Sequence, residues 1–194
     1  MARIILDPGH GGNKPGAVFD PDATIEGDEI KESEINLQVS LACGKLLREK
    51  GHDVLSTRDR DINISLSTRR YMINEFKPEA FLSIHCNATA NHLANGVETF
   101  YRDAVDFSLA STIQHYLTAT TGLKDHGVFQ DFEHLKKHLT VLDNSESTPA
   151  ALVELGFIDN ESDRMYLTRN MATVSEILAD AIDAWTKRRH ETPA

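Results

Sequence analysis

The segment ALVELGF (151–157) is an apolar run with a single acid, Glu154, inside it. A short apolar run of this kind, followed by the turn residues of FIDN, predicts a buried strand. A buried carboxylate without a partner lowers stability strongly. The run therefore predicts that Glu154 is neutral, pairs with an arginine such as Arg58 or Arg69, or faces a cleft.

Outward from this run, strand patterns alternate with helix patterns along the chain. The predicted strands are 3–6, 52–58, 80–88, 96–101, 138–144 and 149–157, and the predicted helices are 33–50, 65–77, 106–122 and one or two within 159–189. Alternation of this kind predicts an α/β fold with a largely parallel sheet covered by helices on both faces. Residues 13–31 form a long loop without apolar periodicity, which is typical of a functional segment.

Length, composition and charge restrict the class of protein. The chain has 194 residues, of which 40% are hydrophobic and 26% charged, as expected for one soluble domain with a sizeable core. We expect that domain to span 1–190, with a solvated tail at 191–194. A formal net charge of −10 argues against nucleic acid and anionic membranes as partners. The N-terminal MARIIL enters a strand directly, so no secretion signal or membrane insertion is predicted.

Three ionisable residues follow or end predicted strands. His10 lies in the turn DPGHGG after the first strand, His85 near the end of AFLSIHCNA, and Glu154 near the end of ALVELGF. Ligand sites of open α/β sheets lie outside the carboxyl ends of the strands, so a shared cleft is predicted. Taken singly, His10 could be a solvated loop residue and His85 a hydrogen-bonded core residue.

Two histidines and a carboxylate suit a catalytic zinc ion, which leaves its fourth position to water. The carboxylate ligand has to come from elsewhere in the chain, and acids crowd together before the first predicted helix. The alternative for this cluster is that it complements the helix dipole. The candidates within EGDEIKESE (26–34) are Glu26, Asp28, Glu29, Glu32 and Glu34.

Six segments in this order resemble the zinc-dependent N-acetylmuramoyl-L-alanine amidases of the amidase 3 type, which cleave peptidoglycan. The segments are IILDPGHGG, KESEINLQVSLACGKLL, STRDRD…SLSTRR, FLSIHCNA, GVETFY and PAALVELGFIDN. The resemblance covers nearly the whole chain and implies a single α/β domain with a mixed, mostly parallel sheet. It implies zinc held by His10, Glu32 and His85, with Glu29 and Glu34 as alternatives to Glu32, and Glu154 as the catalytic glutamate.

The implied reaction is hydrolysis of the amide between N-acetylmuramic acid and L-alanine. Glu154 would take a proton from water and pass it to the leaving amine. Asp7 would either accept a hydrogen bond from a zinc-binding histidine or cap the turn that follows it. One rival function is a catalytically silent peptidoglycan-binding or regulatory module, which would lack one of the four site residues. The other is a zinc carboxypeptidase, which would need an arginine for a terminal carboxylate.

Some relatives of this type carry a long helical insertion that plugs the active site until a partner removes it. Residues 102–144 leave no room for such a plug, so an open site without an activator protein is expected. A chain without a signal peptide would be made in the cytoplasm and act on the cell wall after release, like phage endolysins or the autolysins of a mother cell. A bacterial amidase trimmed at its N-terminus is the alternative.

Overall fold

A six-stranded mixed sheet forms the centre of the molecule, seen in a computed structural model that describes residues 1–21, 29–143 and 148–191. Its strand order is β4-β1-β5-β8-β6-β7. The strands are β1 (Arg3–Pro8), β4 (Asp53–Ser56), β5 (Ala80–Asn87), β6 (Val97–Tyr101), β7 (Asp125–Gln130) and β8 (Ala150–Phe157). Neighbouring strands are parallel except β6 and β8, which are antiparallel. The predicted mixed, mostly parallel sheet is confirmed.

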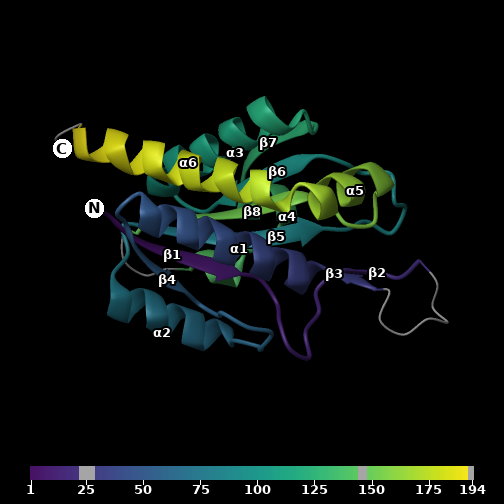
Figure 1. Ribbon diagram of the computed structural model, residues 1–194, viewed down its shortest axis with the longest axis horizontal. Coiled ribbons are helices and arrows are strands. Elements are labelled where there is room, and N and C mark those ends of the chain that lie inside the picture. Colours follow the sequence, from purple (N-terminus) through teal and green to yellow (C-terminus); the bar gives the residue numbers. More distant parts are fainter. Residues whose placement is uncertain (22–28, 144–147, 192–194) are drawn as a thin grey trace.

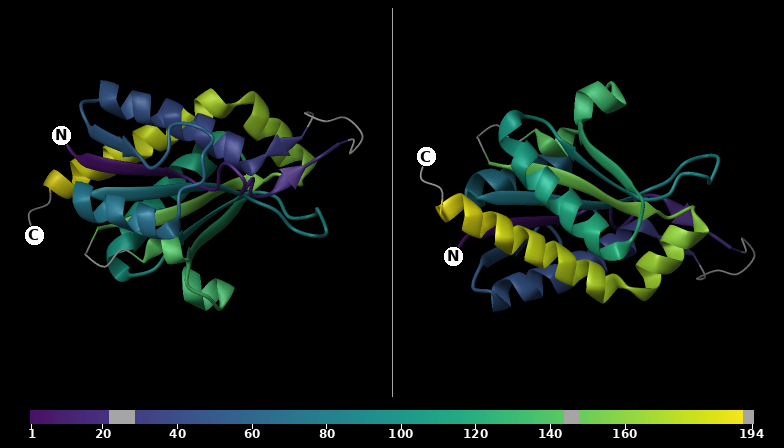
Figure 2. Two further views of the ribbon diagram at one scale, coloured as in Figure 1. Left: turned by 90° about the horizontal axis from the view of Figure 1, so that it is seen from below. Right: turned by 90° about the horizontal axis from the view of Figure 1, so that it is seen from above.

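Helices cover both faces of this sheet. They are α1 (Glu32–Glu49), α2 (Leu66–Phe76), α3 (Ala104–Thr121), α4 (Asp131–Leu135), α5 (Glu161–Arg169) and α6 (Met171–Glu191). Helix α6 packs against both α1 and α3, whereas α2 contacts β1 and the short 3-10 helix η1 (Thr140–Leu142). Figure 1 shows α1 and α6 crossing the near face of the sheet, and the left view of Figure 2 shows α1 and α2 on opposite sides of β1.

The alternation of side chains along each strand separates two cores. On β8, Val153 and Leu155 belong to the larger core beneath α1, α3 and α6, whereas Leu152 belongs to the smaller core beside α2 and η1. Because alternate residues share a face, Glu154 lies on the same face as Leu152. Residues Asp7, His85 and Glu98 fall on this face by the same alternation. The ionisable residues thus occupy the face with the smaller apolar core.

The strand predicted at 138–144 is wrong. Residues Thr140–Leu142 form η1, and the strand of this region is β7, which the sequence pattern did not show. Leu139, Val141 and Leu142 all pack against the smaller core, and a tight turn achieves this as well as a strand does. β7 was missed because it is an edge strand whose residues are mostly half-buried.

The loop predicted at 13–31 contains a short antiparallel pair, β2 (Val18–Phe19) and β3 (Ile30–Lys31), which leads directly into α1. The candidate ligands Glu26 and Asp28 lie outside the described residues, as do residues 192–194 of the predicted tail. In the described part of the chain, no helix is both long and apolar enough to cross a membrane.

Candidate metal centre

Three side chains from separate elements bring their ligand atoms within 4.8 Å of one another: His10, Glu32 and His85. His10 lies in the turn after β1, Glu32 is the first residue of α1, and His85 lies on β5. The Glu32 carboxylate is 3.2 Å from Nε2 of His10 and 2.9 Å from Nδ1 of His85. Two imidazoles and a carboxylate form the donor set of a catalytic zinc site with an open position.

The Glu32 carboxylate is fixed by three further donors. Its Oε2 accepts from the backbone N–H of Ala17 at 2.9 Å, and its Oε1 from the backbone N–H of Cys86 at 3.1 Å and from Nδ2 of Asn36 at 3.2 Å. The alternative acids point elsewhere, since Glu29 pairs with Lys31 at 2.9 Å and Glu34 is exposed two positions further along α1. Among the described residues, three acids were candidate ligands: Glu29, Glu32 and Glu34. Of these three, Glu32 is the one that faces both histidines.

The electrostatics of the site favour a charged carboxylate and a neutral imidazole. Burial alone would raise the pKa of Glu32, but hydrogen bonds from His10 and His85 outweigh it and hold that pKa well below its usual range. Burial lowers the pKa of His85, against the opposing effect of Glu32. These are the protonation states in which both groups can act as metal ligands.

Two glycines make room for this arrangement. A Cβ atom at Gly9 would overlap the imidazole ring of His85, and one at Gly16 would overlap the Glu32 carboxylate. Gly16 also has φ +75°, in the left-handed region that favours glycine. The glycines of DPGHGG and KPG therefore allow the backbone to approach the candidate ligands closely.

Replacing Gly9 with alanine is expected to displace the His85 ring and to weaken zinc binding at least about tenfold, as loss of a supporting residue does. Equilibrium dialysis with a chromogenic zinc indicator would measure this. Gly44→Ala is the matched control, because a Cβ there makes contacts no closer than 3.4 Å. Equal zinc affinity in Gly9→Ala and the parent would contradict the role assigned to this close approach.

Two buried arginines hold the loop that carries His10. Arg58 donates to the carbonyl oxygens of Pro8, Gly9 and Ser33 at 3.0, 2.8 and 2.7 Å. Arg69, on α2, pairs with Asp7. Neither arginine is a partner of Glu154. Arg58 hydrogen-bonds to backbone carbonyl oxygens around this loop, and Arg69 pairs with Asp7.

The expectation that Asp7 accepts a hydrogen bond from a histidine is wrong. Its carboxylate accepts from Arg69, Thr57 and Ser83 instead. Asp7 is paired in register with Ser83, two positions before His85 on β5, and its ion pair with Arg69 turns its side chain to α2 rather than to the histidines. Asp7 thus supports the candidate site indirectly, by joining β1 to β5, to α2 and to Thr57, which follows β4.

Glu154 lies beside the candidate ligands, next to His85 in the sheet. It is the register partner of His85 on β5 and of Glu98 on β6. Its Oε2 is buried and accepts no hydrogen bond from any described residue. Burial raises the pKa of Glu154 well above its usual value, and the charges of Glu32 and Glu98 raise it further. Such a carboxylate is suited to taking up a proton.

Glu98 is an acid next to the candidate site that the sequence analysis did not single out. It lies in the strand VETFY, where Glu98 and Phe100 alternate with residues of the larger core. That alternation, combined with the antiparallel pairing of β6 and β8, was the signal that could have placed Glu98 next to Glu154.

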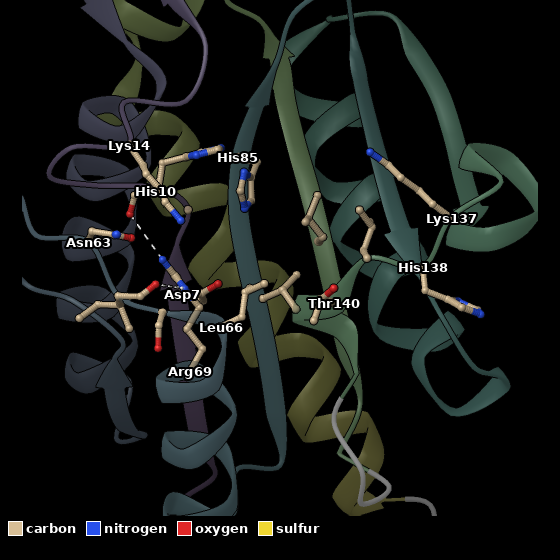
Figure 3. Close-up of a pocket in the computed structure, with 16 residues that line it drawn as sticks. Asp7, His10, Lys14, Asn63, Leu66, Arg69, His85, Lys137, His138 and Thr140 are labelled. Carbon is tan, nitrogen blue, oxygen red and sulfur yellow. Dashed lines mark hydrogen bonds and ion pairs between the residues drawn. The ribbon is translucent and has the colours of Figure 1, made fainter.

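A cavity of about 480 Å³ opens beside the histidines. Figure 3 shows His10 and His85 at one side of it, Arg69 reaching in from α2, and Lys137 and His138 on the opposite wall. The ring centroids of the two histidines are 5.0 Å apart. The candidate metal centre is therefore reached from a cavity large enough for part of a polymeric substrate.

The chain is similar to several bacterial amidases. LytC, an N-acetylmuramoyl-L-alanine amidase of Bacillus subtilis, is 32% identical over 164 residues, which is 82% of this chain but 30% of that relative. The catalytic domain of the amidase CwlV from Bacillus (Paenibacillus) polymyxa is 26% identical with a TM-score of 0.84, covering 96% of this chain and 99% of that one.

A third similar structure is the CwlD amidase of Clostridioides difficile in complex with the GerS lipoprotein. It is 25% identical with a TM-score of 0.82, and the match covers 96% of this chain and 99% of that one. The family described as N-acetylmuramoyl-L-alanine amidase matches residues 4–184. Because this match runs from the first strand of the sheet into α6, the chain belongs to the Amidase_3 family of N-acetylmuramoyl-L-alanine amidases.

Proposed function

We propose that this domain hydrolyses the amide bond between N-acetylmuramic acid and L-alanine in peptidoglycan, with Zn²⁺ held by His10, Glu32 and His85. The observation that carries the proposal is the convergence of these three ligand atoms beside Glu154, whose buried Oε2 has no hydrogen-bond partner among the described residues. Membership of the amidase family supplies the substrate class. The products would be stem peptides separated from glycan strands.

The residues divide the chemistry between them. Zn²⁺, when bound, lowers the pKa of water and polarises the scissile carbonyl. Glu154 takes a proton from the attacking water and transfers it to the nitrogen of the leaving L-alanine. The unpaired Oε2 of Glu154 fits this role, because no donor in the described part of the chain competes with water for it. Asn36 and the backbone donors of Ala17 and Cys86 hold Glu32 in the orientation that a ligand needs.

The site works on the cell wall, outside the cytoplasm, and without an activator protein. Residues 137–141 line one wall of the cavity and leave it open, which supports access by substrate. CwlD was solved with a lipoprotein bound, so dependence on a second protein is the outcome that an assay has to test.

Incubating the intact protein with purified peptidoglycan tests the proposal. We expect new amino groups on L-alanine, about one zinc per chain, loss of activity on chelation and recovery on addition of Zn²⁺. Release of a C-terminal amino acid would favour the zinc carboxypeptidase. Binding to peptidoglycan without release would favour the silent module, and activity only with a second protein would contradict the open site.

A further inference from the structure

Glu98 is a nearly buried acid to which the mechanism above gives no role. Glu98 is 7% exposed and lies directly opposite Glu154 in the antiparallel pair formed by β6 and β8. Like charges directly opposite each other in a sheet lower stability. Among the described residues no lysine or arginine pairs with Glu98. An acid kept at such a position calls for a functional explanation.

The Glu98 carboxylate is directed towards the site. Its Oε1 accepts a hydrogen bond from Nδ2 of Asn87, which is on β5, two residues beyond His85. Strand β8 lies between β5 and β6, so this bond passes over β8. The carboxylate therefore reaches back across the strand that carries Glu154, rather than out towards β7.

The reaction itself produces a group that suits two neighbouring carboxylates. Water adds its hydroxyl to the carbonyl carbon, the C–N bond breaks, and the proton taken by Glu154 goes to the nitrogen. The proton of the new carboxylic acid then follows, which leaves a carboxylate on the lactyl group and an ammonium on L-alanine. A fixed negative charge next to the nitrogen stabilises the positive charge that develops there.

We propose that Glu98 is a second catalytic carboxylate, which contacts the leaving amine and stabilises its positive charge as Glu154 protonates it. This inference rests on the proposed amidase function. It also makes the leaving-group side of the site selective for an ammonium group, a property that can be measured without turnover.

The variant Glu98→Gln separates the charge from the shape. A glutamine Oε1 can still accept the bond from Asn87, while the negative charge is gone. Because the repulsion with Glu154 is removed as well, we expect the melting temperature to stay the same or rise. Glu176→Gln is the matched control, since Glu176 is an exposed acid on α6 and its loss changes the net charge equally.

Binding of two peptides to the zinc-loaded protein tests the inference by calorimetry. One is an L-alanyl peptide with a free amino group, and the other is the same peptide with that group acetylated. We expect the parent and Glu176→Gln to prefer the free amine about tenfold, as a charge-assisted hydrogen bond implies, and Glu98→Gln to lose the preference. We also expect kcat of Glu98→Gln to fall about tenfold with KM little changed.

An equal preference for the free amine in Glu98→Gln and the parent would overturn the inference, and so would a parent that does not discriminate. These failures differ from failure of the proposed function. A parent that releases L-alanine amino groups while Glu98→Gln behaves identically removes the role of Glu98 alone, whereas a parent that releases none removes the amidase.

Discussion

Replacing Glu32 with glutamine is expected to weaken zinc binding more than about 100-fold, beyond the range seen when a supporting residue is lost. The substitution removes the negative charge of the candidate ligand set. It also turns one carboxylate oxygen into an NH2 group, although both oxygens of Glu32 accept hydrogen bonds. An NH2 group would face either the N–H of Ala17 or that of Cys86, so the side chain would have to move.

Zinc titration of the metal-free protein, followed by the peptidoglycan assay, measures this effect. Hydrolysis by Glu32→Gln should be lost at low zinc and recover in part with excess zinc. Glu34→Gln is the matched control, because Glu34 is an exposed acid in the same helical turn. Loss of zinc in Glu34→Gln with retention in Glu32→Gln would reverse the assignment of the ligand.

Most of the fold could be predicted because apolar periodicity determines which segments are buried. Helices α1, α2 and α3 and strands β1, β5 and β8 all carry strong patterns, and their predicted ranges agree with the structure to within a few residues. β7 could not be predicted in this way, because an edge strand of half-buried residues has no strong pattern. The segment 138–144 does have a strand-like pattern, but its apolar residues fit a strand and a tight turn equally well. The pattern alone could not decide between the two.

The candidate site could be predicted in part for a similar reason. His10, His85 and Glu154 follow from the rule that sites lie at the carboxyl ends of strands, which depends only on where strands end. Glu32 could not be separated from its acidic neighbours by local pattern. Its position depends on the close approach of residues 15–17, which place the N–H of Ala17 against its carboxylate.

The supporting residues were the least predictable part of the site. Arg58 and Arg69 occur in segments that suit exposed helices and loops as well as buried positions. Their roles arise from long-range contacts with the turn after β1, to Pro8 and Gly9 for Arg58 and to Asp7 for Arg69. Such contacts depend on tertiary packing, which the spacing of residues along the chain does not contain.

Replacing Glu154 with glutamine is expected to lower the rate of amide hydrolysis about 10²- to 10⁴-fold, the usual effect of removing a general acid–base group. Zinc should remain bound, because His10, Glu32 and His85 are unchanged. The melting temperature should not fall, since Oε2 of Glu154 accepts no hydrogen bond from the described residues and its negative charge is repelled by Glu32 and Glu98.

Three measurements on Glu154→Gln distinguish a proton carrier from a ligand or a structural residue: release of L-alanine amino groups, zinc content and thermal unfolding. Glu161→Gln is the matched control, because Glu161 is an exposed acid at the start of α5, shortly after β8. Loss of zinc together with activity would make Glu154 a metal ligand. A lower melting temperature with proportional loss of activity would make Glu154 structural. Activity equal to the parent's would remove Glu154 from the mechanism, although it is the register partner of His85.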